Sequence, residues 1–135
     1  MNMKIDGSCH CGDISFEAEI DPDQVIVCHC TDCQTLSGSA YRTVVPALEG
    51  SFKLLTGAPK IYIKTAEDGT PRAQVFCPEC GTPIYAGPVG DGTSKIGIRV
   101  GATNQRDQLI PRNQYWCRSA QSWVQDLSSV AKIES

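Results

Sequence analysis

Residues 76–82 have the sequence Phe76-Cys77-Pro78-Glu79-Cys80-Gly81-Thr82, which indicates the type of fold. Two cysteines spaced C-x-x-C present two soft sulfur atoms to one ion. Pro78 restricts one backbone dihedral angle of the turn, and Gly81 lets the chain turn after the second cysteine. This pattern is typical of a zinc knuckle, so we expect two further ligands elsewhere in the chain.

The chain has 135 residues and eight cysteines, and seven of these form three short clusters. Their spacings are C-x-C, C-x-C-x-x-C and C-x-x-C, and their members are Cys9 and Cys11, then Cys28, Cys30 and Cys33, then Cys77 and Cys80. Cysteines this close in sequence seldom meet the geometry of a structural disulfide. The ferredoxin-type spacings of iron-sulfur proteins do not occur in the sequence. Metal ligation explains the clustering, and zinc is the metal we expect.

The central cluster spans only six residues, so its three cysteines are expected to bind one ion together. The other two pairs then form a closed four-thiolate site from Cys9, Cys11, Cys77 and Cys80. We expect that site to be structural, because such a site stabilises small peptides by about 10 to 16 kcal/mol. Three protein ligands and one exchangeable position are the pattern of a catalytic zinc, which the sequence predicts at Cys28, Cys30 and Cys33.

Each of the two histidines is the middle residue of a C-x-C pair. Alternate side chains of an extended chain point to opposite faces, so neither histidine is expected to bind its neighbours' metal. We expect His10 to be structural. For His29, two roles stay open: a proton donor near the site, or a hydrogen-bonded structural residue. Cys117 stands alone and is predicted to be a small core residue.

Composition excludes several classes of protein. Hydrophobic residues make up 41% of the chain, and no apolar run is long enough to cross a membrane. A net charge of −3 without a cluster of Lys and Arg argues against nucleic-acid binding. The N-terminal residues lack the pattern of a secretion signal, so we expect reduced thiols and a cytoplasmic location. We predict one zinc-binding domain over residues 1–135.

Apolar and polar residues alternate over residues 13–20, which predicts a strand with Ile14, Phe16, Ala18 and Ile20 on one face. Further short strands are predicted over residues 24–28, 40–45, 51–55, 60–64, 73–77, 82–86, 95–100 and 114–117. Asp-Gly turns are predicted within 67–71 and 90–93. Helices are expected only over 32–36 and 119–127, the second anchored in the core by Trp123. The predicted class is all-β, meandering and antiparallel.

The basic residues Arg42, Lys64, Arg72 and Arg99 are scattered along separate predicted strands. Most of them are expected to be ordinary solvated residues, and one or two to hold a substrate carboxylate. Arg42 is our candidate for that contact, because it follows the central cysteine cluster by a few residues.

Three motifs, in order and spacing, resemble the glutathione-dependent formaldehyde-activating enzyme family, which also includes the centromere protein V relatives. They are Gly7-Ser8-Cys9-His10-Cys11-Gly12, Cys28-His29-Cys30-Thr31-Asp32-Cys33-Gln34 and the knuckle quoted above. The resemblance implies a β-tent zinc fold of small antiparallel sheets with a short C-terminal helix. It also implies two zinc ions, divided between the cysteines as argued above.

For function, the resemblance implies a carbon-sulfur lyase with glutathione as co-substrate. Such an enzyme adds the thiol to formaldehyde, or to a similar small aldehyde, and catalyses the reverse reaction. With seven thiolates the protein is negatively charged even when two zinc ions are bound. A doubly anionic glutathione therefore needs positively charged side chains close to its binding site. The partners implied are a small-molecule thiol and an aldehyde.

Two other functions remain open. The first is a non-catalytic binding domain in which both zinc ions only stabilise the fold. The second is a thiol redox enzyme similar to the B-type methionine sulfoxide reductases, with Cys117 as nucleophile. That function requires an exposed Cys117 with a depressed pKa. The two C-x-C pairs argue against it, because those reductases bind zinc through two C-x-x-C pairs.

Overall fold

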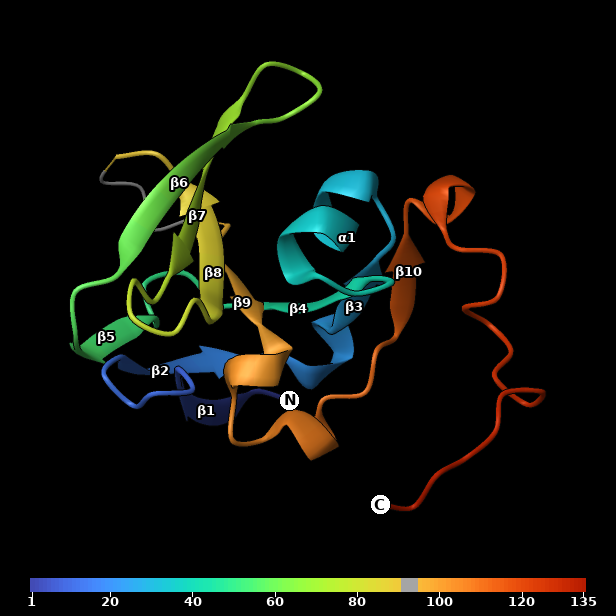
Figure 1. Ribbon diagram of the computed structural model, residues 1–135. Coiled ribbons are helices and arrows are strands. Elements are labelled where there is room, and N and C mark those ends of the chain that lie inside the picture. Colours follow the sequence, from blue (N-terminus) through green and yellow to red (C-terminus); the bar gives the residue numbers. More distant parts are fainter. Residues whose placement is uncertain (91–94) are drawn as a thin grey trace.

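The computed structural model describes residues 1–90 and 95–135, and its strands form two sheets (Figure 1). The three-stranded sheet has the order β1-β2-β5, with β1 (Met3–Ser8), β2 (Ser15–Ile20) and β5 (Lys53–Thr56). The seven-stranded sheet has the order β10-β3-β4-β9-β8-β7-β6. Its strands are β3 (Ile26–Cys28), β4 (Arg42–Pro46), β6 (Lys60–Thr65), β7 (Pro71–Phe76), β8 (Pro83–Pro88), β9 (Gly97–Arg99) and β10 (Asn113–Tyr115).

Helical structure in the described residues is sparse. It consists of α1 (Thr31–Ser37) and four short 3-10 turns, η1 (Pro22–Gln24), η2 (Val100–Ala102), η3 (Arg106–Gln108) and η4 (Cys117–Ser119). The all-β class and the helix expected over 32–36 are therefore confirmed. The Asp-Gly turn predicted within 90–93 falls on 91–93, which lie outside the described residues.

The predicted antiparallel meander is only partly right. β2 pairs with β5 and β4 with β9, although these strands are not consecutive in the chain, and one further pair is parallel. β10 pairs in parallel with β3, with Asn113 opposite Ile26 and Tyr115 opposite Cys28. Antiparallel neighbours are favoured where a tight hairpin joins them, and these two strands are far apart in the chain. The parallel pair carries the residues after Tyr115 to the end of β3, where the central cysteine cluster begins.

The core lies between the two sheets. Ile14, Phe16, Ala18 and Ile20 are all at most 2% exposed, which confirms the alternation predicted for this strand. Phe16 stacks on Phe52 with ring centroids 5.5 Å apart, and Phe52 packs on Tyr85 of β8 at 4.6 Å. Burying each large apolar side chain stabilises the fold by about 1.5 to 3 kcal/mol. The aromatic contacts thus tie the small sheet to the large one.

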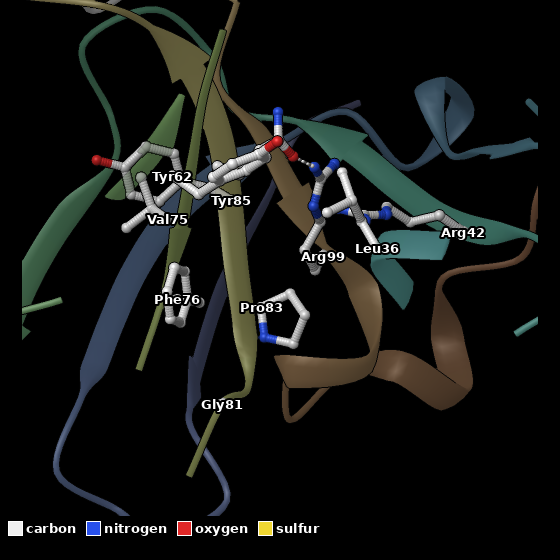
Figure 2. Close-up of a pocket in the computed structure, with 10 residues that line it drawn as sticks. Leu36, Arg42, Tyr62, Val75, Phe76, Gly81, Pro83, Tyr85 and Arg99 are labelled. Atoms are coloured by element: carbon white, nitrogen blue, oxygen red, sulfur yellow. Dashed lines mark hydrogen bonds between the residues drawn. The ribbon is translucent and has the colours of Figure 1, made fainter. Parts of the chain in front are cut away.

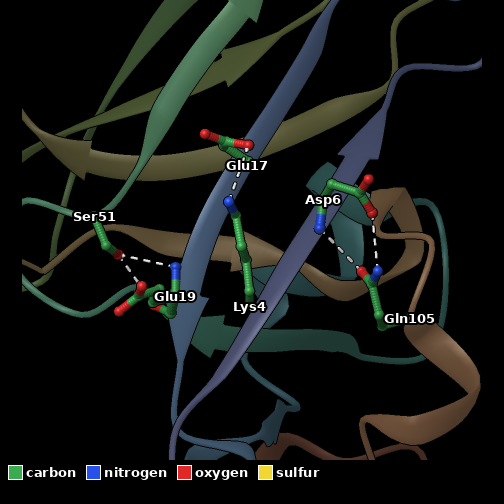
Figure 3. A network of polar contacts seen from close by, with 6 residues as sticks. All are labelled: Lys4, Asp6, Glu17, Glu19, Ser51 and Gln105. Atoms are coloured by element: carbon green, nitrogen blue, oxygen red, sulfur yellow. Dashed lines mark hydrogen bonds and ion pairs between the residues drawn. The ribbon is translucent and has the colours of Figure 1, made fainter.

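A polar network fixes the chain after η2 against β1 (Figure 3). The backbone N–H of Asp6 donates to Oε1 of Gln105 at 3.0 Å, and the Gln105 amide donates back to the Asp6 carboxylate at 2.8 Å. Asn104 adds a third bond to that carboxylate, at 3.1 Å. These hydrogen bonds lower the pKa of Asp6. They hold η2 and η3 close to β1, so the chain that leaves β9 is anchored to the small sheet.

The helix predicted over 119–127 is wrong. Beyond η4 the described chain has turns but neither helix nor strand, and Trp123 is 52% exposed instead of buried in the core. A short helix gains most of its stability by packing an apolar face against the rest of the protein. Leu127 and Val130 are also more than half exposed, so no such face is packed here.

Gly7 offers a direct test of how closely β1 approaches η2. A Cβ atom at this position would overlap the carbonyl oxygen of Ala102 and lie 2.7 Å from the ring of Phe16. We expect Gly7→Ala to lower the free energy of unfolding by at least about 2 kcal/mol, measured by urea denaturation. Gly101→Ala is the control, because a Cβ at Gly101 meets no atom within 4 Å, and it should cost under about 1 kcal/mol. Equal losses in the two variants would contradict this packing.

Candidate functional site

The first cysteine cluster joins the loop after β1 to the turn between β7 and β8. The sulfur atoms of its members, Cys9, Cys11, Cys77 and Cys80, all lie within 4.8 Å of one another. Sγ of Cys11 is 3.6 Å from Sγ of Cys9 and 3.8 Å from Sγ of Cys77. Zinc-sulfur bonds of about 2.3 Å in a tetrahedron put neighbouring sulfurs about 3.8 Å apart. The donor set therefore fits a four-coordinate zinc.

Backbone and hydroxyl groups hold these sulfurs in place. The N–H of Ile14 donates to Sγ of Cys9 at 3.2 Å. In the knuckle, the N–H of Gly81 donates to the carbonyl of Cys77 at 2.8 Å, and Gly81 itself has a φ of +79° that favours glycine. Thr82 links the two loops, because its hydroxyl contacts Sγ of Cys80 at 3.2 Å and accepts the N–H of His10 at 3.0 Å. The Thr82 side chain and nearby backbone N–H groups lower the pKa of Cys80 to about 5.

The second cluster lies where β3 ends and α1 begins. Cys28 ends β3, Cys30 caps the helix and Cys33 lies in its first turn, and their sulfurs are within 4.8 Å of one another. Sγ of Cys30 accepts a hydrogen bond from the N–H of Cys33 at 3.3 Å. The sulfur therefore caps the N-terminus of the helix, as a side-chain oxygen does in other helices. Gly38, with a φ of 65°, ends the helix in the left-handed conformation that glycine favours.

Contacts between the sulfurs of the second cluster shift the pKa values of two of its cysteines in opposite directions. The contact with the Cys33 thiol, helped by the backbone N–H of Cys30, lowers the pKa of Cys28 to about 5 against the opposing effect of burial. The same contact, together with burial, raises the pKa of Cys33. In the described residues, no fourth Cys, His, Asp or Glu joins this cluster. Three soft ligands without a fourth fit a zinc site that keeps one exchangeable position.

The histidines join neither cluster. His29 is 1% exposed, its Nε2 lies 2.9 Å from Oε1 of Gln114, and its ring meets the edge of Tyr41. This arrangement favours the structural role for His29 over the proton donor. His10 is exposed, and its backbone, not its ring, makes the contact with Thr82.

The prediction that Cys117 is buried is wrong. Its side chain is exposed in η4, and its sulfur contacts the carbonyl of Gln114 at 3.7 Å. β10 is an edge strand whose residues are all exposed, and Cys117 follows it on the surface, which the sequence around Cys117 does not reveal. Exposure meets one of the two requirements of the redox alternative.

A cleft of about 530 Å³ opens beside Cys30, and we call it the Cys30 cleft. Its walls come from α1, from the turn that joins β6 to β7, and from the segment after β10. Lys64 lines it and pairs with Asp32, Nζ to Oδ2 at 2.9 Å. The Arg118 guanidinium lies 4.5 Å from the centre of the Trp116 ring, a cation-π contact. Trp116 and Arg118 were not predicted to be site residues, because only the long-range β3–β10 pairing brings them there.

A second cleft, of about 390 Å³, lies beside the C-terminal half of α1 (Figure 2). We call it the arginine cleft, because Arg42 and Arg99 line it. Arg42, our candidate for the contact with a substrate carboxylate, is not a solvated strand residue, since its side chain is buried and only 5% of the residue is exposed. Burial lowers the pKa of both guanidinium groups. At Arg99, the positive charge of the neighbouring Arg42 adds to the effect of burial, and the pKa falls to about 9.

The fold and the two sets of thiols define a small all-β protein with two groups of cysteines that can hold metal ions. The family model described as "Glutathione-dependent formaldehyde-activating enzyme" matches residues 4–119, which include all eight cysteines. The chain belongs to this family, and the resemblance seen in the sequence motifs is confirmed.

A solved structure supports the fold. The chain is similar to the crystal structure of a Rhodobacter sphaeroides protein, with a TM-score of 0.60 and 21% sequence identity. The match covers 83% of this chain and 99% of that one. At this identity the likeness concerns the fold alone. No helix in the described part of the chain has both the length and the apolar character needed to cross a membrane.

The two clusters predict different responses to cysteine substitution. We expect the purified protein to hold two zinc ions, and Cys30→Ser to hold one and stay folded, because only the half-exposed cluster is broken. Cys77→Ser should be largely unfolded, since it removes a buried ligand that joins distant parts of the chain. Cys117→Ser is the control and should keep both ions. Elemental mass spectrometry and circular dichroism measure these outcomes, and a folded Cys77→Ser protein with two ions would contradict the assignment.

Proposed function

We propose that the protein is a carbon-sulfur lyase that adds glutathione to formaldehyde, or to a similar small aldehyde, and catalyses the reverse cleavage. The observation that carries the proposal is the cluster of Cys28, Cys30 and Cys33, which has three thiol ligands and opens to a cleft through Cys30. Membership of the family supports the same reaction.

Two zinc ions are the proposed cofactors. Cys9, Cys11, Cys77 and Cys80 hold the structural ion, because their four sulfurs complete a tetrahedron and leave no position for a substrate. Cys28, Cys30 and Cys33 hold the catalytic-type ion. When bound there, zinc supplies a position at which an incoming thiol is held as its thiolate at neutral pH. These three cysteines are accordingly the proposed catalytic residues.

The side chains of the Cys30 cleft are suited to a peptide thiol. The cleft volume of about 530 Å³ falls in the range of about 300 to 1,000 Å³ typical of ligand sites, and formaldehyde alone needs far less space. Arg118 provides a cation for one carboxylate of glutathione, and Lys64 provides one for the other by exchanging its partner Asp32 for the ligand. Glu67 also lines the cleft and provides a carboxylate for the ammonium group. The residues thus orient the thiol towards Cys30.

The addition is balanced without a redox partner. The thiol proton passes to solvent, the sulfur electron pair forms the new bond to the aldehyde carbon, and the carbonyl electron pair becomes an alkoxide. The alkoxide then takes a proton from water. The reverse reaction breaks the same carbon-sulfur bond. The chain's own contribution is to bind the thiol, to orient it and to compensate its negative charge.

The domain, its compartment and its partners are also proposed here. We propose that residues 1–135 form a single zinc-binding domain that works in the cytoplasm, where thiols stay reduced. The proposed partners are a small-molecule thiol and a small aldehyde, with neither nucleic acid nor membrane involved.

The lyase activity is tested by exchange between ¹³C-formaldehyde and S-hydroxymethylglutathione, followed by NMR above the uncatalysed background. We expect the wild-type protein to accelerate the exchange and Cys30→Ser to reduce it to background. Arg118→Gln should raise KM for glutathione by about tenfold through loss of a charged hydrogen bond, with a smaller effect on kcat. Cys117→Ser should retain full activity.

Two outcomes would favour the alternatives. A wild-type protein that binds two zinc ions but gives only background exchange would support a zinc-stabilised binding domain. Loss of activity in Cys117→Ser, with both zinc ions retained, would support the redox enzyme.

A further inference from the structure

Arg42 has a buried charge without a partner. The guanidinium stays protonated in proteins, and its Nε and Nη2 atoms are closed to solvent and make no hydrogen bond. Among the ion pairs of the described residues, none includes Arg42. Burying an unpaired charge is costly, so an anion is expected to compensate it.

Arg99 adds a second cation beside the first. Arg99 on β9 lies opposite Val44 on β4, so Arg42, two residues earlier on β4, is its diagonal neighbour on the same face. Nη2 of Arg99 donates to Oε1 of Gln74 at 2.9 Å, while its Nε is buried without a partner. Gln74 is neutral, so the hydrogen bond leaves the charge of Arg99 uncompensated.

The second cysteine cluster accounts for part of the missing negative charge. Charges on Cys28 and Cys33 act on both arginines and oppose the lowering of their pKa values. Three thiolates around one zinc ion carry a net charge of −1, whereas the two guanidinium groups carry +2. Before the thiol binds, one positive charge therefore remains, and it favours a carboxylate in this cleft.

The opposite wall of the arginine cleft is apolar. Figure 2 shows Tyr62, Phe76 and Tyr85 on one side of the cleft and the two arginines with Leu36 on the other. The cleft volume of about 390 Å³ is large enough for an organic ligand. Leu36 lies one helical turn after Cys33, so a ligand in this cleft is close to the second cluster.

We propose that the arginine cleft binds an organic acid with one carboxylate and an apolar body. The carboxylate lies between Arg42 and Arg99, and the apolar body lies against the aromatic wall. Resting on the proposed function, this site selects the second substrate: the aldehyde that accepts the thiol carries a carboxylate and is larger than formaldehyde. The carboxylate is unchanged in the reaction, because only the carbonyl group gains the sulfur and the proton.

The binding site is tested with 3-phenylpropionate and the neutral 3-phenylpropanamide, which has the same shape. Titration calorimetry of the zinc-loaded protein should show one 3-phenylpropionate bound per chain and at least tenfold weaker binding of the amide. Arg99→Gln should weaken 3-phenylpropionate binding at least tenfold. Tyr62→Ala changes a half-exposed wall residue, so it should fold normally and weaken binding of both probes.

Arg118→Gln is the matched control, because it removes an arginine from the Cys30 cleft alone, and it should leave 3-phenylpropionate binding unchanged. Equal binding of acid and amide, or an equal loss in Arg118→Gln and Arg99→Gln, would overturn the proposal. If Arg99→Gln does not fold, the comparison of the two probes and the Tyr62→Ala variant still decide it.

The titration contains neither glutathione nor aldehyde, so its result is independent of the lyase activity. Acid binding in a protein without thiol addition would retain the carboxylate site and remove the proposed function. Thiol addition to formaldehyde without acid binding would retain the proposed function and overturn this inference.

Discussion

The gathering of four sulfur atoms from Cys9, Cys11, Cys77 and Cys80 determines how the two sheets are held together. It joins the end of β1 to the turn between β7 and β8, and so connects the small sheet to the large one. Thr82 reinforces the junction through its contacts with both loops. With zinc bound, this junction is expected to contribute stabilisation comparable to the whole stability of a domain, about 5 to 15 kcal/mol.

The same junction places the second cluster and its two clefts. β8 leaves the knuckle, and β9 and β4 extend the sheet to β3, whose last residue is Cys28. Helix α1 lies beside both clefts, with Cys30, Thr31 and Asp32 lining the Cys30 cleft and Leu36 lining the arginine cleft. A site with two neighbouring clefts suits a reaction between two substrates, one of which carries the thiol.

The parts predicted from sequence are those governed by local pattern. The period-two alternation placed Ile14, Phe16, Ala18 and Ile20 correctly in the core, and the cysteine spacing grouped the seven clustered thiols as the structure does. The burial of Arg42 and the exposure of Cys117 could not be predicted, because both depend on pairings between distant strands. The helix expected around Trp123 failed for another reason, since no apolar face packs there. Nothing near Arg42 in sequence shows that β9 will bring Arg99 beside it, and nothing near Cys117 shows that β10 will run parallel to β3.

We propose that one thiol cluster holds the fold together and that the other is an open site. This proposal is tested most directly by titrating the zinc-loaded protein with a chelator while zinc release and near-ultraviolet circular dichroism are measured on the same sample. We expect the first zinc to leave with the folded spectrum intact and the second to leave as that spectrum is lost. A folded spectrum that survives the removal of both ions, or that disappears with the first, would contradict it.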